Sequence, residues 1–303
     1  MIDLSPISAA TSLRLRAGSL DPAALERLVT VALVEDLAAG VDVTSVATVA
    51  SEQRCVVTFG VRESGVVAGL AVAAAVVDMV CGDRAADFEY LVGDGDRVGA
   101  GQAVARVSAP TCSILTAERT ALNLLCHLSG IATRTARWVD ALGVSGAQVR
   151  DTRKTLPGLR ALQKYAVRCG GGVNHRMGLY DMALVKDNHV ASAGGVAEAY
   201  AAVRRFDESM PVEIEVDNLD ALRVAIEAGA DEVLIDNFSA AQMRAAVELR
   251  DEIGPGVSLE ASGGLTLDTA AEVAATGVDF IAVGELTHSV RVLDIGLDFE
   301  TVI

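Results

Sequence analysis

Six short apolar runs in the second half of the chain constrain its fold more than any other feature. Each run ends in polar residues and precedes a helix-like segment, and the polar ends lie at residues 151–154, 184–188, 214–218, 234–237, 259–264 and 281–285. This spacing is typical of successive βα units. Polar strand ends predict a (β/α) barrel, because the C-terminal face of a barrel builds active sites. The alternative, an open doubly wound sheet, usually carries a glycine-rich dinucleotide fingerprint that this sequence lacks.

The first half of the chain has a different, mixed pattern. Residues 1–20 show no clear period, and we expect them to be loosely ordered. Pro22–Leu37 is predicted to be a helix with Asp21 as its N-cap. Strand-like runs at 55–61, 89–92 and 103–107 surround an apolar helix at 69–79, and one or two helices are expected over 116–142. These elements predict a separate structural domain.

One segment of this half suggests a carrier function that the lysines exclude. Residues 93–107 look like the turn-rich hairpins of biotinyl and lipoyl carrier modules. Such modules need an acceptor lysine on the hairpin, and the first lysine of the chain is Lys154. We therefore interpret the segment as part of a structural β-domain.

Composition bounds the possible partners and the compartment. A formal net charge of −16 argues against general nucleic-acid binding, which needs a broad basic face. The five cysteines show no CxxC spacing, so we expect free thiols in a reducing compartment. Residues 66–77 are apolar but too short to span a bilayer, and the N-terminus lacks a leader pattern. We expect a soluble, cytoplasmic protein that binds neither nucleic acid nor membrane.

All three lysines lie in one short stretch, at Lys154, Lys164 and Lys186. The window 150–189 also holds five arginines against three aspartates, within a strongly acidic chain. Arginine is a planar fork suited to carboxylates, whereas lysine is a compact point charge. A basic island of this kind predicts a small anionic ligand.

Several residues of this island occupy predicted strand ends or loops. Arg153 and Lys154 follow one strand, Lys186 ends the next, and His175 and Arg176 lie in a loop that opens with three glycines. We expect these five side chains to surround a ligand that bears carboxylates; the alternative is solvated surface charge.

The other basic residues and the remaining histidines are less suited to that role. Arg160 and Lys164 fall on a predicted helix, where an exposed face is an equal alternative. His127, His189 and His288 have no metal-ligand spacing, and we interpret them as structural.

Two carboxylates end consecutive predicted strands, at Glu215 and Asp236. A barrel would place them side by side, where carboxylates and a phosphate-bearing substrate can hold Mg²⁺. The alternative is a helix cap or an ion-pair partner for Lys186. Asp217 and Asn218 are expected to be caps.

Glycine-containing loops follow the last two predicted strands. Ser262, Gly263 and Gly264 follow one, and Val283, Gly284 and Glu285 follow the other. Backbone N–H groups of such loops can approach a phosphate. Because no serine or cysteine is paired with a base in a nucleophile motif, the sequence does not support covalent catalysis.

Taken together, several strings resemble the quinolinate phosphoribosyltransferase family. They are ALVEDLAAGVDVTS, AERTALNLLCHLSGIAT, DTRKTLPGLRALQKYAVRCGGGVNHRMGLYDMALVKDNH, EIEVDN, LIDNF, EASGG and VGELTHS, and the similarity runs from about residue 28 to residue 297. The 39-residue central string is highly specific. One departure, LAAGVDVTS where the family commonly has LGxGDxTS, shifts the context of Asp42 in a loop that we take to be structural.

The resemblance implies a fold and an activity. It implies an N-terminal α/β sandwich domain at 21–128, completed by about 288–303, and an incomplete (β/α) barrel at 129–287. The implied reaction transfers phosphoribosyl from phosphoribosyl pyrophosphate to quinolinate with Mg²⁺, giving nicotinate mononucleotide, pyrophosphate and CO₂ for NAD biosynthesis. Catalysis would fall to Lys154, Lys186, Glu215 and Asp236, the last two binding the metal. The implied substrate-binding residues are Arg119, Thr152, Arg153, Lys154, His175, Arg176, Lys186, Glu215, Asp236, Ser262, Gly263, Gly264, Val283, Gly284 and Glu285.

The resemblance also implies a homodimer, or a higher oligomer built from dimers, in which Arg119 reaches the neighbouring subunit's site. The enzymatic alternatives are a pyrophosphorylase-like paralogue with another acidic acceptor and a nicotinate phosphoribosyltransferase. A metabolite-binding sensor without turnover is the non-enzymatic alternative.

Overall fold

The protein divides into two compact units in a computed structural model that describes residues 4–38, 40–82 and 86–303. The first unit comprises Met1–Arg134, Leu156–Gly170 and Ser289–Ile303, and the second comprises Thr135–Thr155 and Gly171–His288. The described residues contain no helix with the length and hydrophobicity required to cross a bilayer.

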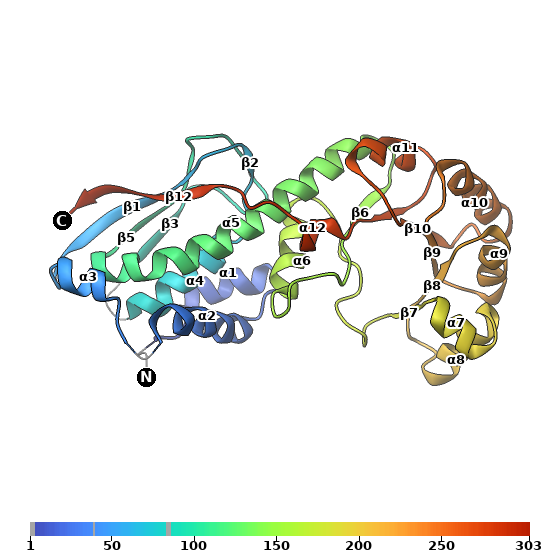
Figure 1. Ribbon diagram of the computed structural model, residues 1–303, viewed down its shortest axis with the longest axis horizontal. Helices are drawn as coiled ribbons and strands as arrows, with labels where there is room; N and C mark the ends of the chain where they lie inside the picture. The colour runs from blue at the N-terminus through green and yellow to red at the C-terminus, as the bar shows by residue number, and fades with distance from the viewer. Residues whose placement is uncertain (1–3, 39, 83–85) are drawn as a thin grey trace. The chain divides into compact units, whose positions relative to one another are not determined.

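The first unit is an α/β sandwich built on a four-stranded antiparallel sheet (Figure 1). Its helices are α1 (Ala9–Ala17), α2 (Pro22–Leu37), α3 (Val43–Thr48), α4 (Leu70–Cys81), α5 (Thr111–Leu142, ending in the second unit) and α6 (Arg160–Cys169). Its strands are β1 (Arg54–Val61), β2 (Gly65–Val66), β3 (Asp87–Tyr90), β4 (Arg97–Val98), β5 (Ala103–Pro110) and β12 (Ile295–Val302). The sheet order is β12-β1-β5-β3, so the C-terminal strand completes the sheet of the N-terminal segment.

The core of this unit follows from its apolar pattern. Val57 and Phe59 on β1 are fully buried, and nine of the twelve residues of α4 are buried. A helix that is apolar on all sides must lie inside a domain, and α4 packs against α1, α2 and β5. The predicted helix at Pro22–Leu37 is confirmed, with the Asp21 side chain accepting a hydrogen bond from the backbone of Ala23.

The N-terminal segment is more ordered than expected. Residues 1–3 of the expected loose segment lie outside the described residues, but α1 forms over Ala9–Ala17 with Ser8 as its N-cap. Leu15 is 1% exposed because α1 packs against α4. The prediction that residues 4–20 are loosely ordered was therefore wrong. The helix is short and contains two arginines, which make its apolar face hard to recognise in the sequence.

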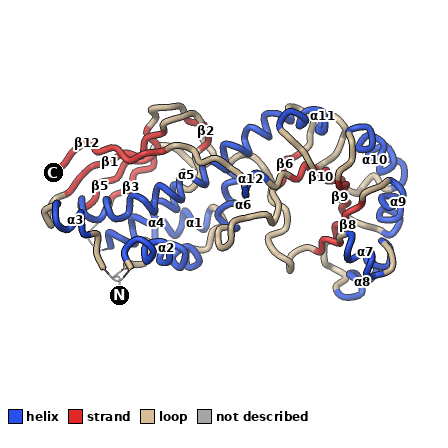
Figure 2. Tube along the Cα trace, viewed as in Figure 1, coloured by secondary structure: helices blue, strands red, loops and turns tan. Residues whose placement is uncertain are grey.

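The second unit is an incomplete (β/α) barrel, which confirms the predicted fold class (Figure 2). Its parallel strands are β6 (Gln148–Arg150), β7 (Ala183–Val185), β8 (Val212–Val216), β9 (Glu232–Asp236), β10 (Ser258–Ser262) and β11 (Phe280–Ala282). Its helices are α7 (Asp187–Ala193), α8 (Val196–Phe206), α9 (Leu219–Ala228), α10 (Ala240–Ile253), the 3₁₀ turn η2 (Leu267–Thr269), α11 (Ala270–Ala274) and α12 (Glu285–His288). Figure 2 shows the strands inside and helices α7 to α11 outside.

The barrel is open at one position. The strand order is β6-β11-β10-β9-β8-β7, so β11 pairs with β6 and each remaining strand pairs with its successor. In the described chain, β6 and β7 do not pair, and only a single bridge from Arg150 to Val173 continues the sheet beyond β6. All six strand ends that carry polar residues thus meet at one edge, as the repeat predicts.

The division into units differs from the expected boundary in two segments, of which residues 129–134 are the shorter and group with the first unit. Residues 156–170, with α6, group with the first unit and not with the barrel. The Tyr165 hydroxyl donates a 2.6 Å hydrogen bond to Asp94, and Arg168 donates a 2.8 Å hydrogen bond to the carbonyl of Gly18. These bonds, together with the buried apolar face of α6, attach the helix to the first unit.

Candidate active site

A cavity of about 500 Å³ opens at the C-terminal ends of the barrel strands. It contains polar side chains that the sequence placed at strand ends, together with apolar ones that the sequence did not single out. Its lining residues are Thr152, Arg153, Lys154, His175, Arg176, Leu184, Lys186, Glu215, Leu234, Asp236, Glu260, Ser262 and Ala282. A concave site with a few convergent polar groups is the usual form of a ligand site.

The acidic part of the cavity comes from neighbouring strands β8 and β9. Glu215 lies one residue before the end of β8, and Asp236 is the last residue of β9. Burial raises the pKa of Asp236, and the Glu215 carboxylate raises it further, whereas Lys186 and Lys154 lower it. The two carboxylates and two lysines therefore act on one another, as expected for side chains that meet at one barrel edge.

Lys186 links the acidic part to helix α7. Its Nζ lies 2.7 Å from Oε2 of Glu215, and its side chain is 48% exposed. Lys186 is also the N-cap residue of α7, and its backbone N–H donates a 2.9 Å hydrogen bond to Nδ1 of His189. An exposed ion pair contributes little to stability, so Lys186 can exchange Glu215 for a ligand anion at small cost.

The basic part of the cavity is formed by Arg153, Lys154 and Arg176. Burial and then the nearby Arg153 charge lower the pKa of Arg176, so two guanidinium groups lie close together. Nη1 of Arg176 donates to the carbonyl of Met182 at 3.0 Å. Nε of Arg153 is buried and finds no hydrogen-bond acceptor among the described residues. Paired guanidinium groups with an unused buried donor favour an anionic ligand.

A buried ionic network lies beneath these groups. Arg150 on β6 binds Glu232 of β9 and, at 2.7 Å, Oε2 of Glu260 of β10. Nε2 of His175 lies 2.7 Å from Oε2 of Glu213 on β8. Burial and then Glu232 raise the pKa of Glu213 to about 8, and burial and then Glu213 raise the pKa of Glu260 to about 8.

The hydrogen bonds of His175 define its tautomer. The backbone N–H of Arg176 donates to Nδ1 at 2.6 Å, so Nδ1 is an acceptor. The ring proton then lies on Nε2 and is donated to Glu213. With both ring nitrogens engaged, His175 fixes the backbone of Arg176 against the barrel interior.

Two sets of side chains have the chemistry of a metal site. The ligand atoms of His175, Glu213 and Glu260 lie within 4.8 Å of one another. The hydrogen bond from His175 to Glu213 places a proton between two of these atoms, and Arg150 binds the third residue, so this set does not suit a cation. Glu215 and Asp236 fit better, because Mg²⁺ takes one or two carboxylates together with water and substrate phosphates.

Other predicted site residues lie outside this cavity. Arg119 belongs to α5 in the first unit, where its 66% exposed side chain borders a separate cavity with Arg291. Glu285 accepts a 2.9 Å hydrogen bond from the indole of Trp138. Gly284 faces the cavity wall, since a Cβ there would lie 3.1 Å from Cδ of Lys154. Gly263, Gly264 and Val283 are not among the lining residues.

Sequence reasoning missed the buried glutamates. Glu213 and Glu260 are 0% exposed, and Glu260 lines the cavity. The sequence does contain a signal for them, because the apolar strands VEIEV and SLEAS carry acids at interior positions. Lys164 does not lie on an exposed helix face, which was one of the two alternatives for it. Its side chain is 0% exposed on α6 in the first unit.

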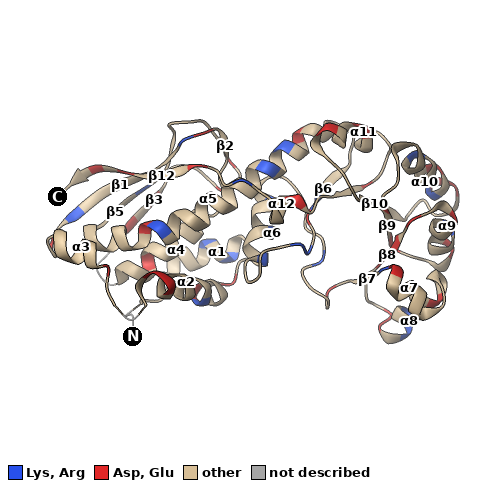
Figure 3. Ribbon diagram, viewed as in Figure 1, with Lys and Arg blue, Asp and Glu red and all other residues tan. Residues whose placement is uncertain are grey.

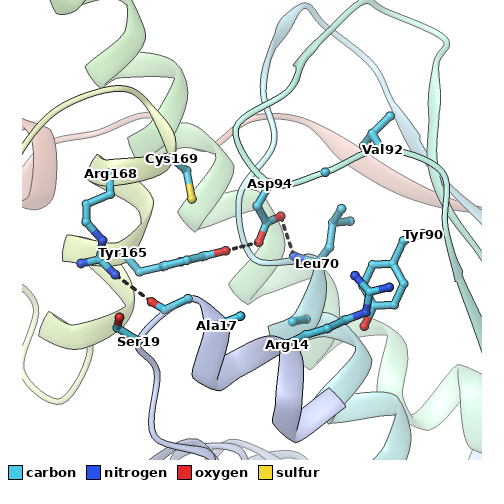
Figure 4. Close-up of a pocket in the computed structure, with 13 residues that line it drawn as sticks. Arg14, Ala17, Ser19, Leu70, Tyr90, Val92, Asp94, Tyr165, Arg168 and Cys169 are labelled. Atoms are coloured by element: carbon cyan, nitrogen blue, oxygen red, sulfur yellow. Dashed lines mark hydrogen bonds between the residues drawn. The ribbon is translucent and has the colours of Figure 1, made fainter. Parts of the chain in front are cut away.

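A second cavity of about 500 Å³ lies in the first unit (Figure 4). Its polar groups bind one another: Tyr165 donates to Asp94, Asp94 accepts from the backbone of Leu70, and Arg168 donates to Gly18. Arg14 stacks over the ring of Tyr90 at 3.9 Å. This internal pairing contrasts with the barrel cavity, where Arg153 and Glu260 each keep a buried atom without a hydrogen bond in the described structure.

Comparison with known proteins gives consistent matches over nearly the whole chain. Residues 42–129 match the quinolinate phosphoribosyl transferase N-terminal domain, and residues 131–298 match the C-terminal domain of that family. The chain is 54% identical over 267 residues to a nicotinate-nucleotide pyrophosphorylase [carboxylating] of Mycobacterium leprae, covering 88% of this chain and 94% of that protein. It is 39% identical to a probable enzyme of the same name from Bacillus subtilis, with 90% and 93% covered. The structure of the nicotinate-nucleotide pyrophosphorylase from Francisella tularensis matches with a TM-score of 0.86 and 40% identity, covering 91% of this chain and 96% of that chain.

Proposed function

This chain belongs to the quinolinate phosphoribosyl transferase family, and from that premise we propose that its barrel cavity transfers phosphoribosyl to quinolinate with loss of CO₂. The products are nicotinate mononucleotide, pyrophosphate and CO₂, within de novo NAD biosynthesis. The observation that carries this proposal is that one cavity brings together two half-buried guanidinium groups and an acidic pair flanked by lysines. A dicarboxylate and a metal-bound polyphosphate require these two kinds of surface.

Quinolinate is assigned to the basic part of the cavity. Arg153 and Arg176 supply planar forks for its two carboxylates, and Nε of Arg153 is a buried donor still without an acceptor in the described structure. His175 acts as a positioning residue here, because both of its ring nitrogens are already engaged. Thr152 and Lys154 border the same space.

Phosphoribosyl pyrophosphate is assigned to the acidic part. Glu215 and Asp236 would hold Mg²⁺, which would neutralise charge on the pyrophosphate when bound. Lys154 and Lys186 interact with the same carboxylates and can follow the phosphates as point charges. Ser262, Gly263 and Gly264 would approach the 5′-phosphate, since both glycines have left-handed backbone angles, φ 92° and 60°. Val283, Gly284 and Glu285 are assigned to the same phosphate-binding edge.

The chain's groups act by stabilising charge and not by forming a covalent intermediate. Lysines beside the departing pyrophosphate favour cleavage at the ribose carbon, which gains oxocarbenium character. The pyridine nitrogen of quinolinate attacks that carbon, and the ring becomes a pyridinium. The cationic ring then accepts the electron pair released when the adjacent C2 carboxylate leaves as CO₂. The apolar side chains of Leu184, Leu234 and Ala282 favour this loss of charge.

We assign Arg119 to the active site of a second subunit in a homodimer or a dimer-based oligomer. Its cavity in the first unit is a separate one from the barrel cavity. Its side chain is exposed and available to an anionic ligand held by another copy. A cytoplasmic location is proposed from the five free thiols, which suit a reducing compartment.

An assay of pyrophosphate release tests the proposed function. The expected result is Mg²⁺-dependent pyrophosphate release that requires quinolinate and yields equimolar CO₂. Equal or faster turnover with nicotinate would support a nicotinate phosphoribosyltransferase, and turnover only with another acid would support a paralogue. Binding of quinolinate without turnover would instead indicate a sensor.

A further inference from the structure

The proposed reaction needs a proton that its two substrates do not supply at the required position. When the C2–carboxylate bond breaks, CO₂ departs and the electron pair stays on C2 of the pyridinium ring. A proton must take the place of CO₂ on C2 to give nicotinate mononucleotide. The inference below rests on the proposed function and concerns the source of this proton.

Three carboxyl groups line the barrel cavity, and they have different surroundings. Glu215 is paired with Lys186 at 2.7 Å. Burial and then Glu215 raise the pKa of Asp236, but Lys186 and Lys154 lower it, and its Oδ2 accepts a 2.7 Å hydrogen bond from Asn237. Glu260 is 0% exposed, its Oε2 binds Arg150, and its Oε1 is buried without a hydrogen-bond partner among the described residues. A buried carboxyl oxygen without a donor is the position most compatible with a bound proton.

We propose that Glu260 enters the reaction as a carboxylic acid and that its Oε1–H donates the proton that replaces CO₂ at C2. The O–H bond breaks in the same step as the C2–carboxylate bond, the electron pair left on C2 forms the new C–H bond, and Glu260 is left as a carboxylate. Loss of the proton donor therefore slows CO₂ release itself. Water reprotonates the carboxylate after product leaves, so the step needs no other reactant. Glu260 is thereby the general acid of the decarboxylation half of the reaction.

The groups that face Glu260 support this protonation state. Oε1 lies 3.7 Å from Nε2 of His175, whose proton is already donated to Glu213. Glu213 on β8 and Glu232 on β9 disfavour a negative charge on Glu260. Arg150 on β6 and His175 favour that charge. Burial is the largest effect, and the pKa of Glu260 is raised to about 8. Burial and the neighbouring carboxylates thus favour the acid form of Glu260.

Glu260 also lines the cavity to which quinolinate is assigned. Arg176 follows His175 directly in the chain, and its charge acts on Glu213. Glu260 lines the same cavity as Arg176. Glu260 and Arg176 thus border the same cavity to which quinolinate is assigned.

Two variants separate a proton donor from a structural carboxylate. Glu260→Gln keeps the size of the side chain but cannot donate an acidic proton, whereas Glu232→Gln removes a carboxylate from the same Arg150 network without touching the cavity. In a single turnover, Glu260→Gln should release pyrophosphate but slow CO₂ release by about 100-fold or more. The phosphoribosylated dicarboxylate should accumulate in Glu260→Gln and not in Glu232→Gln. Equal rates of CO₂ release in wild type and Glu260→Gln would overturn the assignment.

The isotope content of the product gives a second readout that a structural role would not change. Turnover in an equal mixture of H₂O and D₂O fixes an H/D ratio at C2, measurable by NMR. Because a carboxylic acid and water discriminate differently between the isotopes, the ratio should differ between wild type and Glu260→Gln. The same ratio in both proteins would identify water as the donor and overturn the proposal.

The wild-type protein provides a test that does not depend on folding of a variant. Since Glu260 must be protonated, single-turnover CO₂ release should be retained below pH 8 and lost as pH rises through about 8. Glu260→Asp, which retains an acid one methylene further away, should keep the wild-type H/D ratio while releasing CO₂ more slowly. CO₂ release that stays constant across this pH range contradicts the inference, whereas wild type without quinolinate-dependent pyrophosphate release contradicts the proposed function itself.

Discussion

Arg153 is the cavity residue whose surroundings most directly imply an anionic ligand. Its Nε is buried with no acceptor in the described part of the chain, and its charge acts on Arg176. A buried donor left unpaired is costly, and a carboxylate that accepts from it removes that cost. The guanidinium fork can do this bidentately, which the ammonium group of lysine cannot.

Arg153→Lys should therefore weaken quinolinate binding more than it slows chemistry. Losing a charge-assisted hydrogen bond costs about 1.5–3 kcal/mol, which is about 10–150-fold in KM for quinolinate. We expect kcat to change little, because the lost bond is present in both the ground and transition states. Steady-state kinetics measure both values, and Arg205→Lys on the exposed end of α8 is the matched control. A kcat defect with unchanged KM would contradict this role.

Arg150 holds together the carboxylates beneath the cavity. It binds Glu232 and Glu260, and its guanidinium lies 3.5 Å from the ring centroid of Phe280. Removing one partner of a buried ionic network leaves uncompensated charge, at a cost of about 3–5 kcal/mol. Because Arg150 connects three strands of the barrel, its loss should lower the free energy of unfolding of that unit.

Arg150→Met is thus expected to lower the free energy of unfolding of the barrel by about 3–5 kcal/mol. Arg223→Met is the control, since its 3.9 Å pair with Glu227 is exposed and worth less than about 0.5 kcal/mol. Urea unfolding followed by the fluorescence of Trp138, the single tryptophan, reports on this unit. Equal destabilisation by the two substitutions would show that the buried network is not a stabilising core.

At the scale of elements, helix α3 depends on one cap. Asp42 accepts from the backbone of Ser45 at 3.0 Å and from its hydroxyl at 2.5 Å. A contact with Thr116 on α5 at 3.3 Å connects this cap to the neighbouring helix. The departure from the family pattern around Asp42 therefore lies at a helix N-terminus, consistent with the structural role expected for that loop.

The cap makes the stability of α3 dependent on pH. The hydrogen bonds from Ser45 lower the pKa of Asp42 in the folded state. Its contribution is therefore present above the unfolded pKa and is lost as pH falls through the folded one. Asp42→Ala should cost about 1 kcal/mol at neutral pH. Asp42→Asn, which caps without titrating, should retain most of that stability and lose the pH dependence. Hydrogen exchange of the α3 amides measures both, and identical acid profiles for wild type and Asp42→Asn would refute the assignment.

Periodicity predicted the elements more completely than the side-chain contacts. The six barrel strands are recognisable because apolar runs ending in polar residues are local patterns, and Glu215 and Asp236 follow from strand order. Glu213 and Glu260 could not be assigned in the same way, because their roles depend on Arg150 and His175 from distant segments. The burial of Lys164 likewise depends on the packing of α6 into the first unit. Long-range pairing, and not local propensity, decides these positions.

At the scale of the whole molecule, the charges divide into a local basic island and a dispersed acidic background. Acidic residues recur on helices α2, α7 and α9 (Figure 3). The net charge is −16, yet Arg153, Lys154, Arg176 and Lys186 converge on one cavity. Such a distribution concentrates small anions at the barrel and disfavours extended polyanions. Arg119 is the predicted site residue that belongs to the first unit and not to the barrel, and this position on α5 is why we assign it to a second copy.

Mixing two inactive variants tests that assignment. Arg119→Ala and Lys154→Ala should each be nearly inactive, because every site in each homodimer lacks one basic group. In a hybrid dimer, one site combines Lys154 of the first variant with Arg119 of the second, and the other site lacks both. Random assortment of a symmetric dimer from equal amounts should then restore about one quarter of wild-type activity. Pyrophosphate release after joint refolding measures the recovery. Mixing Arg119→Ala with an Arg119→Ala/Lys154→Ala double variant gives no intact site and is the control. A mixture as inactive as its parents, with hybrid dimers demonstrated by differential tags, would place Arg119 outside the partner's site.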